Sequence, residues 1–145
     1  MSADRPTVII VQAPYYKDVT DMIAGSVIKE LDSAGYGHEI MDVPGVFEVP
    51  AAIKLAMQSG RGYAGAVALG CVIRGETDHY DHICRESSRA LMDLAMAGVP
   101  LGFGILTCEN YEQAMARADI ARKNKGKEVA AACLRMMALK SELGA

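Results

Sequence analysis

Several functional groups are concentrated in the stretch ALGCVIRGETDHYDHIC, residues 68–84. An apolar run ends there, and Gly75 lets the backbone turn tightly. Thr77 or Asp78 can cap the helix expected next, and the free N–H groups at the start of a helix bind anions well. His79 falls in the first turn of that helix, where the helix dipole disfavours imidazolium and helps to keep a neutral base. The stretch therefore indicates anion binding and acid–base chemistry at one chain reversal.

The same stretch has two other interpretations. The first is a capped helix start whose histidines only face solvent. The second is a metal site, because His79 and His82 lie three residues apart and can share a helix face. Cys84 does not complete such a set, since at roughly 100° per residue it points about 140° away from His79. With no fourth ligand and no CxxC pair in the sequence, no metal is expected.

Two further segments carry groups that suit a small polar ligand. VPGVFEVP, residues 43–50, holds a turn, an aromatic ring and a carboxylate. Glu48 can accept hydrogen bonds from a polyol, whereas Phe47 is equally suited to a core, and a Pro-Gly turn before a helix is ordinary. The basic run in EQAMARADIARKNKGK, residues 112–127, fits a solvated helix end, but one arginine such as Arg117 is enough to bind a phosphate. GxxxxGK[ST] does not occur, and GxGxxG occurs only as GRGYAG, residues 60–65, which leads into a predicted strand and does not open a helix after one, so a nucleotide-phosphate loop is not expected.

The elements that must position these groups alternate regularly. Apolar and β-branched runs predict strands at residues 7–12, 38–43, 63–73 and 100–107, helical spacing predicts a helix after each, and a last helix is predicted over residues 128–143. Such alternation predicts a parallel sheet with helices on both faces. The polar clusters APYYKD, PGVFE, RGETDH and TCEN each follow a strand, where ligands bind in such folds. We therefore expect a three-layer α/β/α fold with a four-stranded parallel sheet, doubly wound and flavodoxin-like, and a small-molecule site.

Length and composition limit the classes of protein. The 145 residues are expected to form a single domain, residues 1–145, and the net charge of −3 argues against nucleic acid or an anionic membrane as a partner. Four cysteines without paired spacing are typical of reduced thiols. The apolar run at residues 8–11 is too short for an export signal or a spanning helix. We therefore expect a cytoplasmic protein, and its alanine- and methionine-rich apolar content favours an oligomer.

Four segments in order, VPGVFEVPAAIK, ALGCVIRGETDHYDHIC, FGILTCENYEQAMARA and NKGKEVAAACLRM, resemble the motifs of the 6,7-dimethyl-8-ribityllumazine synthase family. The resemblance runs from Val8 to Met137. It implies a transferase that condenses 5-amino-6-(D-ribitylamino)uracil with 3,4-dihydroxy-2-butanone 4-phosphate, the penultimate step of riboflavin biosynthesis. An amine attacks the ketone, the imine loses phosphate, and the ring closes with loss of water. The resemblance implies no redox cofactor and no metal, and it implies sites between the subunits of a homopentamer.

The resemblance also implies roles for residues at matching motif positions. His79 would be the general acid–base, and Tyr15 stands where the family has an aromatic ring that stacks on the pyrimidine. Phe103 and Arg117 would reach in from a neighbouring subunit, and Lys125 would lie near the ring. The ribityl chain would be contacted by Val46, Phe47 and Glu48, and the pyrimidine by Cys71, Val72 and Ile73. The phosphate would be bound by Gly75, Glu76 and Thr77 together with Arg117.

Departures from the family pattern and three rival functions bear on this interpretation. APYY, residues 13–16, stands where many members have Ala-Arg-Phe or Ala-Arg-Trp, and ADIARKNKG, residues 118–126, lacks the G-[TG]-K-x-G turn common in sixty-subunit capsids. The second departure favours a pentamer or a pair of pentamers.

An archaeal-type riboflavin synthase would need no phosphate site, and a non-catalytic flavin or lumazine binder would not need His79. A flavodoxin-like or receiver-like signalling module would need an acidic or a Ser/Thr/Gly pocket after the first strand, where QAPYYKD supplies neither.

Overall fold

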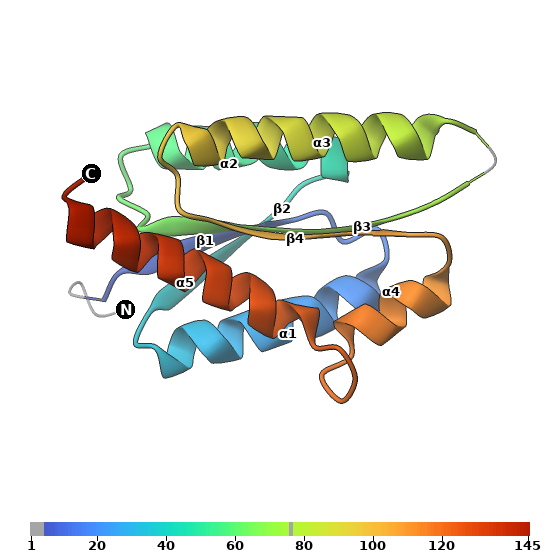
Figure 1. The fold of residues 1–145 in the computed structure, drawn as a ribbon, viewed down its shortest axis with the longest axis horizontal. Helices are drawn as coiled ribbons and strands as arrows, with labels where there is room; N and C mark the ends of the chain where they lie inside the picture. Colours follow the sequence, from blue (N-terminus) through green and yellow to red (C-terminus); the bar gives the residue numbers. More distant parts are fainter. Residues whose placement is uncertain (1–4, 76) are drawn as a thin grey trace.

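The computed structural model describes residues 5–75 and 77–145. Within that part of the chain, four strands form one parallel sheet in the order β2-β1-β3-β4 (Figure 1). The strand order reverses between β1 and β3, because the chain first adds β2 on one side and then crosses back. The strands are β1 (Thr7–Gln12), β2 (Gly37–Asp42), β3 (Gly65–Ile73) and β4 (Leu101–Cys108).

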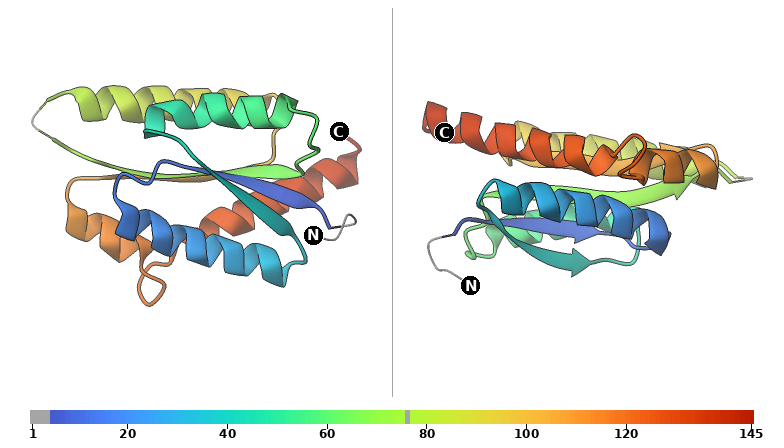
Figure 2. Two further views of the ribbon diagram at one scale, coloured as in Figure 1. Left: turned by 180° about the vertical axis from the view of Figure 1, so that it is seen from behind. Right: turned by 90° about the horizontal axis from the view of Figure 1, so that it is seen from below.

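Helices cover both faces of this sheet (Figure 2). Each face has its own buried apolar cluster, so the sheet is packed on both sides. This arrangement confirms the predicted three-layer α/β/α fold with a four-stranded parallel sheet. One face carries α1 (Lys17–Ser33), α4 (Tyr111–Ala118) and α5 (Lys125–Leu143), and the other carries α2 (Val49–Gln58) and α3 (His79–Met96), with a short 3-10 helix, η1 (Val46–Glu48), before α2.

The element boundaries follow the sequence closely. The strand predicted at residues 7–12 is confirmed at both ends, and the other three strands differ by one or two residues at an end. The last helix begins at Lys125, three residues before the predicted start. Its first turn lacks apolar periodicity, and its start is marked instead by Asn124, which has a left-handed φ of 46°. In the described part of the chain, no helix is long and apolar enough to cross a membrane.

Two glycines let α5 lie close to its neighbours. A Cβ atom at Gly102 of β4 would lie 2.6 Å from the carbonyl oxygen of Val129, and one at Gly126 would lie 2.6 Å from the carbonyl oxygen of Ile23 in α1. Real Cβ atoms do not approach backbone oxygens so closely, so only glycine fits at either position without a backbone shift. These contacts fix the start of α5, including Lys125, against β4 and α1.

Candidate active site

A pocket of about 510 Å³ lies at the carboxyl end of the sheet. The loops after β1 and β2, the end of β3 and the start of α3 meet there, beside the point where the strand order reverses. Ligands of open α/β sheets bind at such a point. Eight residues that the sequence predicted for a site line this pocket: Tyr15, Val46, Phe47, Glu48, Cys71, Val72, Ile73 and His79.

His79 is the first residue of α3 and is exposed in the pocket. Its backbone N–H donates a hydrogen bond to the hydroxyl oxygen of Thr77 at 3.2 Å, which confirms one of the two predicted capping residues. The side chain of Asp78 makes no capping bond, and its Oδ2 lies 3.3 Å from Nε2 of His82. Among the described residues, none bonds to the imidazole of His79. The ring is therefore available to exchange a proton with a ligand.

Two exposed aromatic rings line the pocket. Tyr15 is 79% exposed and meets Tyr16 edge-on, with ring centroids 4.9 Å apart. Phe47 is 58% exposed because η1 buries Val46 and turns the next side chain outward. Exposed rings of this kind can stack on a planar ligand. Glu48, also exposed, adds a carboxylate that can accept hydrogen bonds from hydroxyl groups.

The end of β3 contributes backbone groups to the pocket. Pairing with β1 stops at Leu69, whereas pairing with β4 continues to Ile73. On the side of β1, the strand from Cys71 to Ile73 therefore has backbone groups outside the sheet ladder, and these residues line the pocket. Groups of this kind can donate to and accept from the edge of a heterocycle.

Cys71 is not a nucleophile in this arrangement. Its side chain is only 5% exposed, and burial raises the pKa of its thiol to about 12. A thiol with that pKa stays protonated near neutral pH, and the thiolate is the reactive form. The side chain therefore serves packing, and the contribution of Cys71 to the pocket lies in its backbone.

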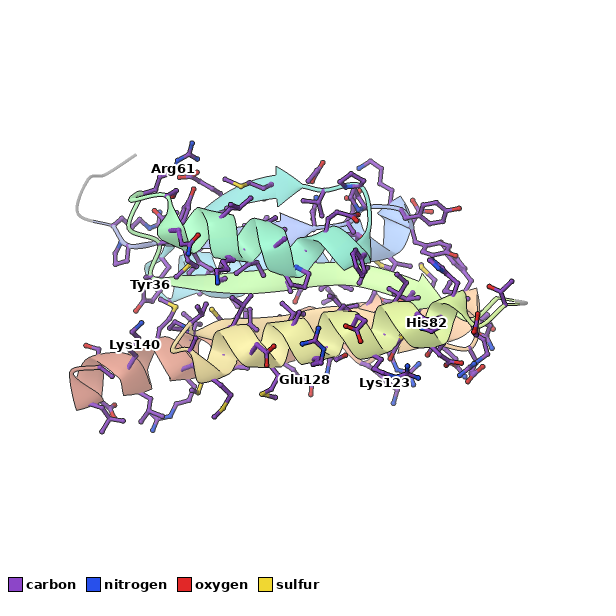
Figure 3. All side chains as sticks on the ribbon, turned by 90° about the horizontal axis from the view of Figure 1, so that it is seen from above. Tyr36, Arg61, His82, Lys123, Glu128 and Lys140 are labelled. Carbon is purple, nitrogen blue, oxygen red and sulfur yellow. The ribbon has the colours of Figure 1, made fainter. Side chains whose placement is uncertain are left out.

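A second pocket, of about 380 Å³, lies against the edge strand β4. Figure 3 shows Lys123 and Glu128 on the side of the sheet opposite to β2. The lining contains three cationic side chains and one carboxylate, so the pocket favours an anion. Its lining residues are Phe103, Ile105, Leu106, Thr107, Arg117, Lys123, Lys125 and Glu128.

Arg117 lies in the last turn of α4 and is held from one side. Its Nη1 donates to the backbone oxygen of Gln113 at 3.3 Å and lies 3.8 Å from Sγ of Cys108. Both contacts use the same nitrogen, whereas a guanidinium has five N–H donors. The remaining donors suit the planar, two-pronged binding of a phosphate.

The two pockets share no lining residue. Within one chain the structure therefore does not bring Phe103, Arg117 and Lys125 to His79. Gly75 and Thr77 are exposed between β3 and α3 and line neither pocket. Glu76, the remaining predicted phosphate contact, lies outside the described residues.

Several lining residues were missed by the sequence analysis. Ile83 lies one turn after His79, so helical spacing alone would have found it. Lys123 was noted only as part of the basic run, and nothing in its sequence context separates it from the neighbouring cations. Four others in the first pocket follow strand ends, where only the sheet order shows which loops meet: Ala13, Tyr16, Pro44 and Gly45. The rest lie in the second pocket, on β4 and α5, and are Ile105, Leu106, Thr107 and Glu128.

Metal-ligating side chains do not cluster in the described part of the chain. No three histidine, cysteine or acidic side chains in residues 5–75 and 77–145 are placed to hold a metal ion. The four cysteines, Cys71, Cys84, Cys108 and Cys133, are free thiols.

Comparison with known proteins gives one family. The sequence profile described as 6,7-dimethyl-8-ribityllumazine synthase matches residues 5–141. The chain is 52% identical over 137 residues to the 6,7-dimethyl-8-ribityllumazine synthase of Sphingopyxis alaskensis, covering 94% of this chain and 96% of the relative. It is 47% identical over 144 residues to the enzyme of the same name from Paramagnetospirillum magneticum, covering 94% and 96%. It is 47% identical over 145 residues to that of Agrobacterium fabrum, covering 97% and 98%.

Proposed function

The chain belongs to the 6,7-dimethyl-8-ribityllumazine synthase family, and from that premise we propose which residues carry the reaction. The enzyme condenses 5-amino-6-(D-ribitylamino)uracil with 3,4-dihydroxy-2-butanone 4-phosphate to 6,7-dimethyl-8-ribityllumazine, releasing phosphate and water. This is the penultimate step of riboflavin biosynthesis. The chemistry requires a proton carrier, a surface for the ring and polyol, and an anchor for the phosphate.

His79 is the proton carrier. The observation that supports this role most strongly is its position in the 510 Å³ pocket beside two exposed aromatic rings and a carboxylate. When the amine adds to the ketone, its nitrogen must lose a proton, and the carbonyl oxygen must gain protons before it leaves as water. An imidazole in this position can take the first proton and return it in the later steps. The same group then assists loss of phosphate and ring closure.

The pyrimidine and its ribityl chain occupy the rest of this pocket. Tyr15 stacks on the ring, and backbone groups from Cys71 to Ile73, left unpaired on the β1 side, bind the ring edge. Val46 and Phe47 contact the ribityl chain, whose hydroxyl groups donate to Glu48. The polyol then fixes the ring in one orientation relative to His79, as effective catalysis requires.

The phosphate end is held by cations from a neighbouring subunit. Arg117 has free donors for the phosphate, Gly75 and Thr77 offer further contacts at the start of α3, and Lys125 and Phe103 accompany Arg117 in the second pocket. This assignment is supported by the complete separation of the two pockets in one chain and by the position of the second pocket at the edge of the sheet. A rotationally symmetric ring joins two different surfaces of neighbouring subunits, so it can bring the edge strand of one subunit to the His79 pocket of the next.

We infer a homopentamer, or a pair of pentamers, rather than a sixty-subunit capsid. The segment ADIARKNKG, residues 118–126, lacks the turn pattern common in capsid-forming members, and α5 starts within it, at Lys125. The four free thiols support a reducing compartment, and we therefore place the enzyme in the cytoplasm.

The assay that tests the proposed function supplies purified protein with both substrates and follows the lumazine chromophore together with released phosphate. The expected result is equal amounts of both products. If neither forms while lumazine or riboflavin binds, the chain is a non-catalytic binder. If lumazine is consumed to give riboflavin, it is a riboflavin synthase, an outcome disfavoured by the three cations of the second pocket.

A further inference from the structure

A group of side chains links the ends of β3 and β4 to the first turn of α3, at the two residues after His79. Arg74 follows β3, and its Nε donates to Oε2 of Glu109, just after β4, at 2.9 Å. Its Nη1 donates to Oδ1 of Asp81, in the first turn of α3, at 3.4 Å. The guanidinium also lies over the ring of Tyr80, 4.3 Å from the centroid. We call Arg74, Tyr80, Asp81 and Glu109 the Arg74 clamp.

The contacts of Tyr80 and of the Arg74 backbone extend this clamp. The Tyr80 hydroxyl lies beside the side chains of Thr107 and Cys84, and the backbone N–H of Arg74 donates to the carbonyl oxygen of Cys108 at 2.9 Å. The two residues that follow His79 on α3 are therefore fixed to the ends of β3 and β4. None of the four clamp residues lines either pocket, although Thr107, beside Tyr80, lines the second.

His79 depends on such support because its own ring is not anchored. Its backbone N–H bonds to Thr77, but the imidazole has no partner among the described residues. The position of the ring is therefore set by the backbone of the first turn of α3. A catalytic group must be held to within a fraction of an ångström, because a misplacement of about 1 Å can cost on the order of a hundredfold in rate.

We infer that Arg74 is a positioning residue that holds the first turn of α3, and with it His79, in place over the pocket. The inference rests on the proposed role of His79 as proton carrier. Arg74 acts here through geometry rather than through global stability, since partly exposed ion pairs contribute little to the free energy of unfolding. Its removal should therefore slow the reaction far more than it lowers the melting temperature.

The test compares three substitutions of arginine. Arg74→Met keeps roughly the length of the side chain but removes the guanidinium and its two hydrogen bonds, and Arg74→Lys keeps the positive charge. Arg5→Met is the matched control, because Arg5 also bonds to two acceptors, Asp32 Oδ1 at 2.6 Å and the Tyr36 carbonyl oxygen at 2.8 Å, at the amino end of β1. We expect kcat to fall on the order of tenfold in Arg74→Met, with KM for both substrates within about twofold, and to fall less in Arg74→Lys. Arg5→Met should match the wild-type kcat.

A double-mutant cycle separates positioning from a general structural role. In a His79→Ala background, Arg74→Met should change the residual kcat by no more than about twofold, because the group it positions is absent. An equal loss of rate with and without His79, or a wild-type kcat in Arg74→Met, would overturn the inference. A wild-type enzyme that forms no lumazine would instead refute the proposed function.

The imidazole itself gives a readout that does not depend on activity. The chain has only three histidines, so NMR with selectively labelled histidine can follow each ring through a pH titration. The resonances of His79 should shift or broaden in both Arg74 variants, including the lysine variant that keeps the charge, while those of His38 stay unchanged. Resonances of His79 that are identical in all four proteins would contradict the inference whatever the rates.

Discussion

The two pockets of this chain differ in the chemistry that they offer. The pocket around His79 has an imidazole, two exposed aromatic rings and the Glu48 carboxylate, and its lining among the described residues contains no lysine or arginine. The pocket along β4 has Arg117 with two lysines and no histidine. The first set of groups suits proton transfer on a stacked ring, and the second suits an anion. A condensation that expels phosphate needs both kinds of surface, so we propose that each pocket is one half of a site.

The order of the strands explains why the halves are separate. β1 and β3 lie in the middle of the sheet, and the loops after them meet at the point where the order reverses, which places the His79 pocket there. β4 is an edge strand of the described sheet, and the second pocket lies against it without a lining residue in common with the first. With His79 as the proposed proton carrier and the cations at the sheet edge, the account requires association of subunits to combine them.

The largest effect is expected in the first pocket, for His79→Ala. Loss of the proton carrier should lower kcat on the order of 10²–10⁴-fold, with KM values and assembly little changed. His38→Ala, which removes an exposed histidine of β2 that lines neither pocket, is the control. Steady-state kinetics of the two variants measures kcat and KM, and light scattering measures their assembly. A wild-type kcat in His79→Ala would remove His79 from the mechanism.

The second pocket should respond differently. Arg117→Ala loses charge-assisted hydrogen bonds to the phosphate, so the KM for the phosphorylated substrate should rise on the order of 10–100-fold, while the KM for the pyrimidine substrate stays near the wild-type value. Arg122→Ala, which removes an exposed arginine paired with Asp119 outside the pocket, should leave both values unchanged. An unaltered KM in Arg117→Ala would mean that the phosphate is bound elsewhere.

A backbone contact allows the second pocket to be disturbed without touching a charged residue. Gly102→Ala places a Cβ atom against the carbonyl oxygen of Val129 in α5. We expect a loss of about 1–3 kcal/mol in the free energy of unfolding, together with a raised KM for the phosphorylated substrate as Lys125 moves with α5. Gly25→Ala, whose Cβ atom would meet nothing within 4 Å, should instead stabilise α1 by up to about 1 kcal/mol. Denaturant unfolding of both variants measures the difference, and equal stabilities would contradict the packing account.

The smallest effect concerns buried thiols near each half. Burial raises the pKa of Cys71, at the first pocket, and of Cys133, in α5, to about 12 from an ordinary value of 9.0. As pH rises above 9, thiols of the unfolded chain lose protons while the folded chain keeps them, so the unfolded state is favoured. Each thiol should lower stability by roughly 1 kcal/mol per pH unit between pH 9 and 12. The free energy of unfolding, measured from pH 8 to 10.5, should decline less steeply with pH in Cys133→Ala than in the wild type. Identical slopes would mean that the Cys133 thiol does not cause the decline.

The sequence predicted the fold better than the complete site. Short apolar runs such as residues 7–12 have local signals, so the strands and their order in the chain were recovered from periodicity. The His79 pocket was also within reach, because polar residues after successive parallel strands meet at one edge. The Arg74 clamp was not, since its contact with Glu109 joins residues 35 positions apart. The start of α5 was misplaced for a similar reason, because Gly126 is fixed by its approach to α1 rather than by apolar spacing.

The most direct test of the central claim mixes subunits of two inactive variants. His79→Ala supplies an intact second pocket and Arg117→Ala an intact first pocket, so neither alone forms a full site. If the sites lie between subunits, co-assembly at equal amounts should restore about a quarter of wild-type sites, because half of the first pockets and half of their neighbours are intact in a random ring. Titration of active sites, at substrate concentrations where Arg117→Ala alone is inactive, measures this fraction. No recovery in verified mixed oligomers would show that His79 and Arg117 act within one chain, and would contradict the account.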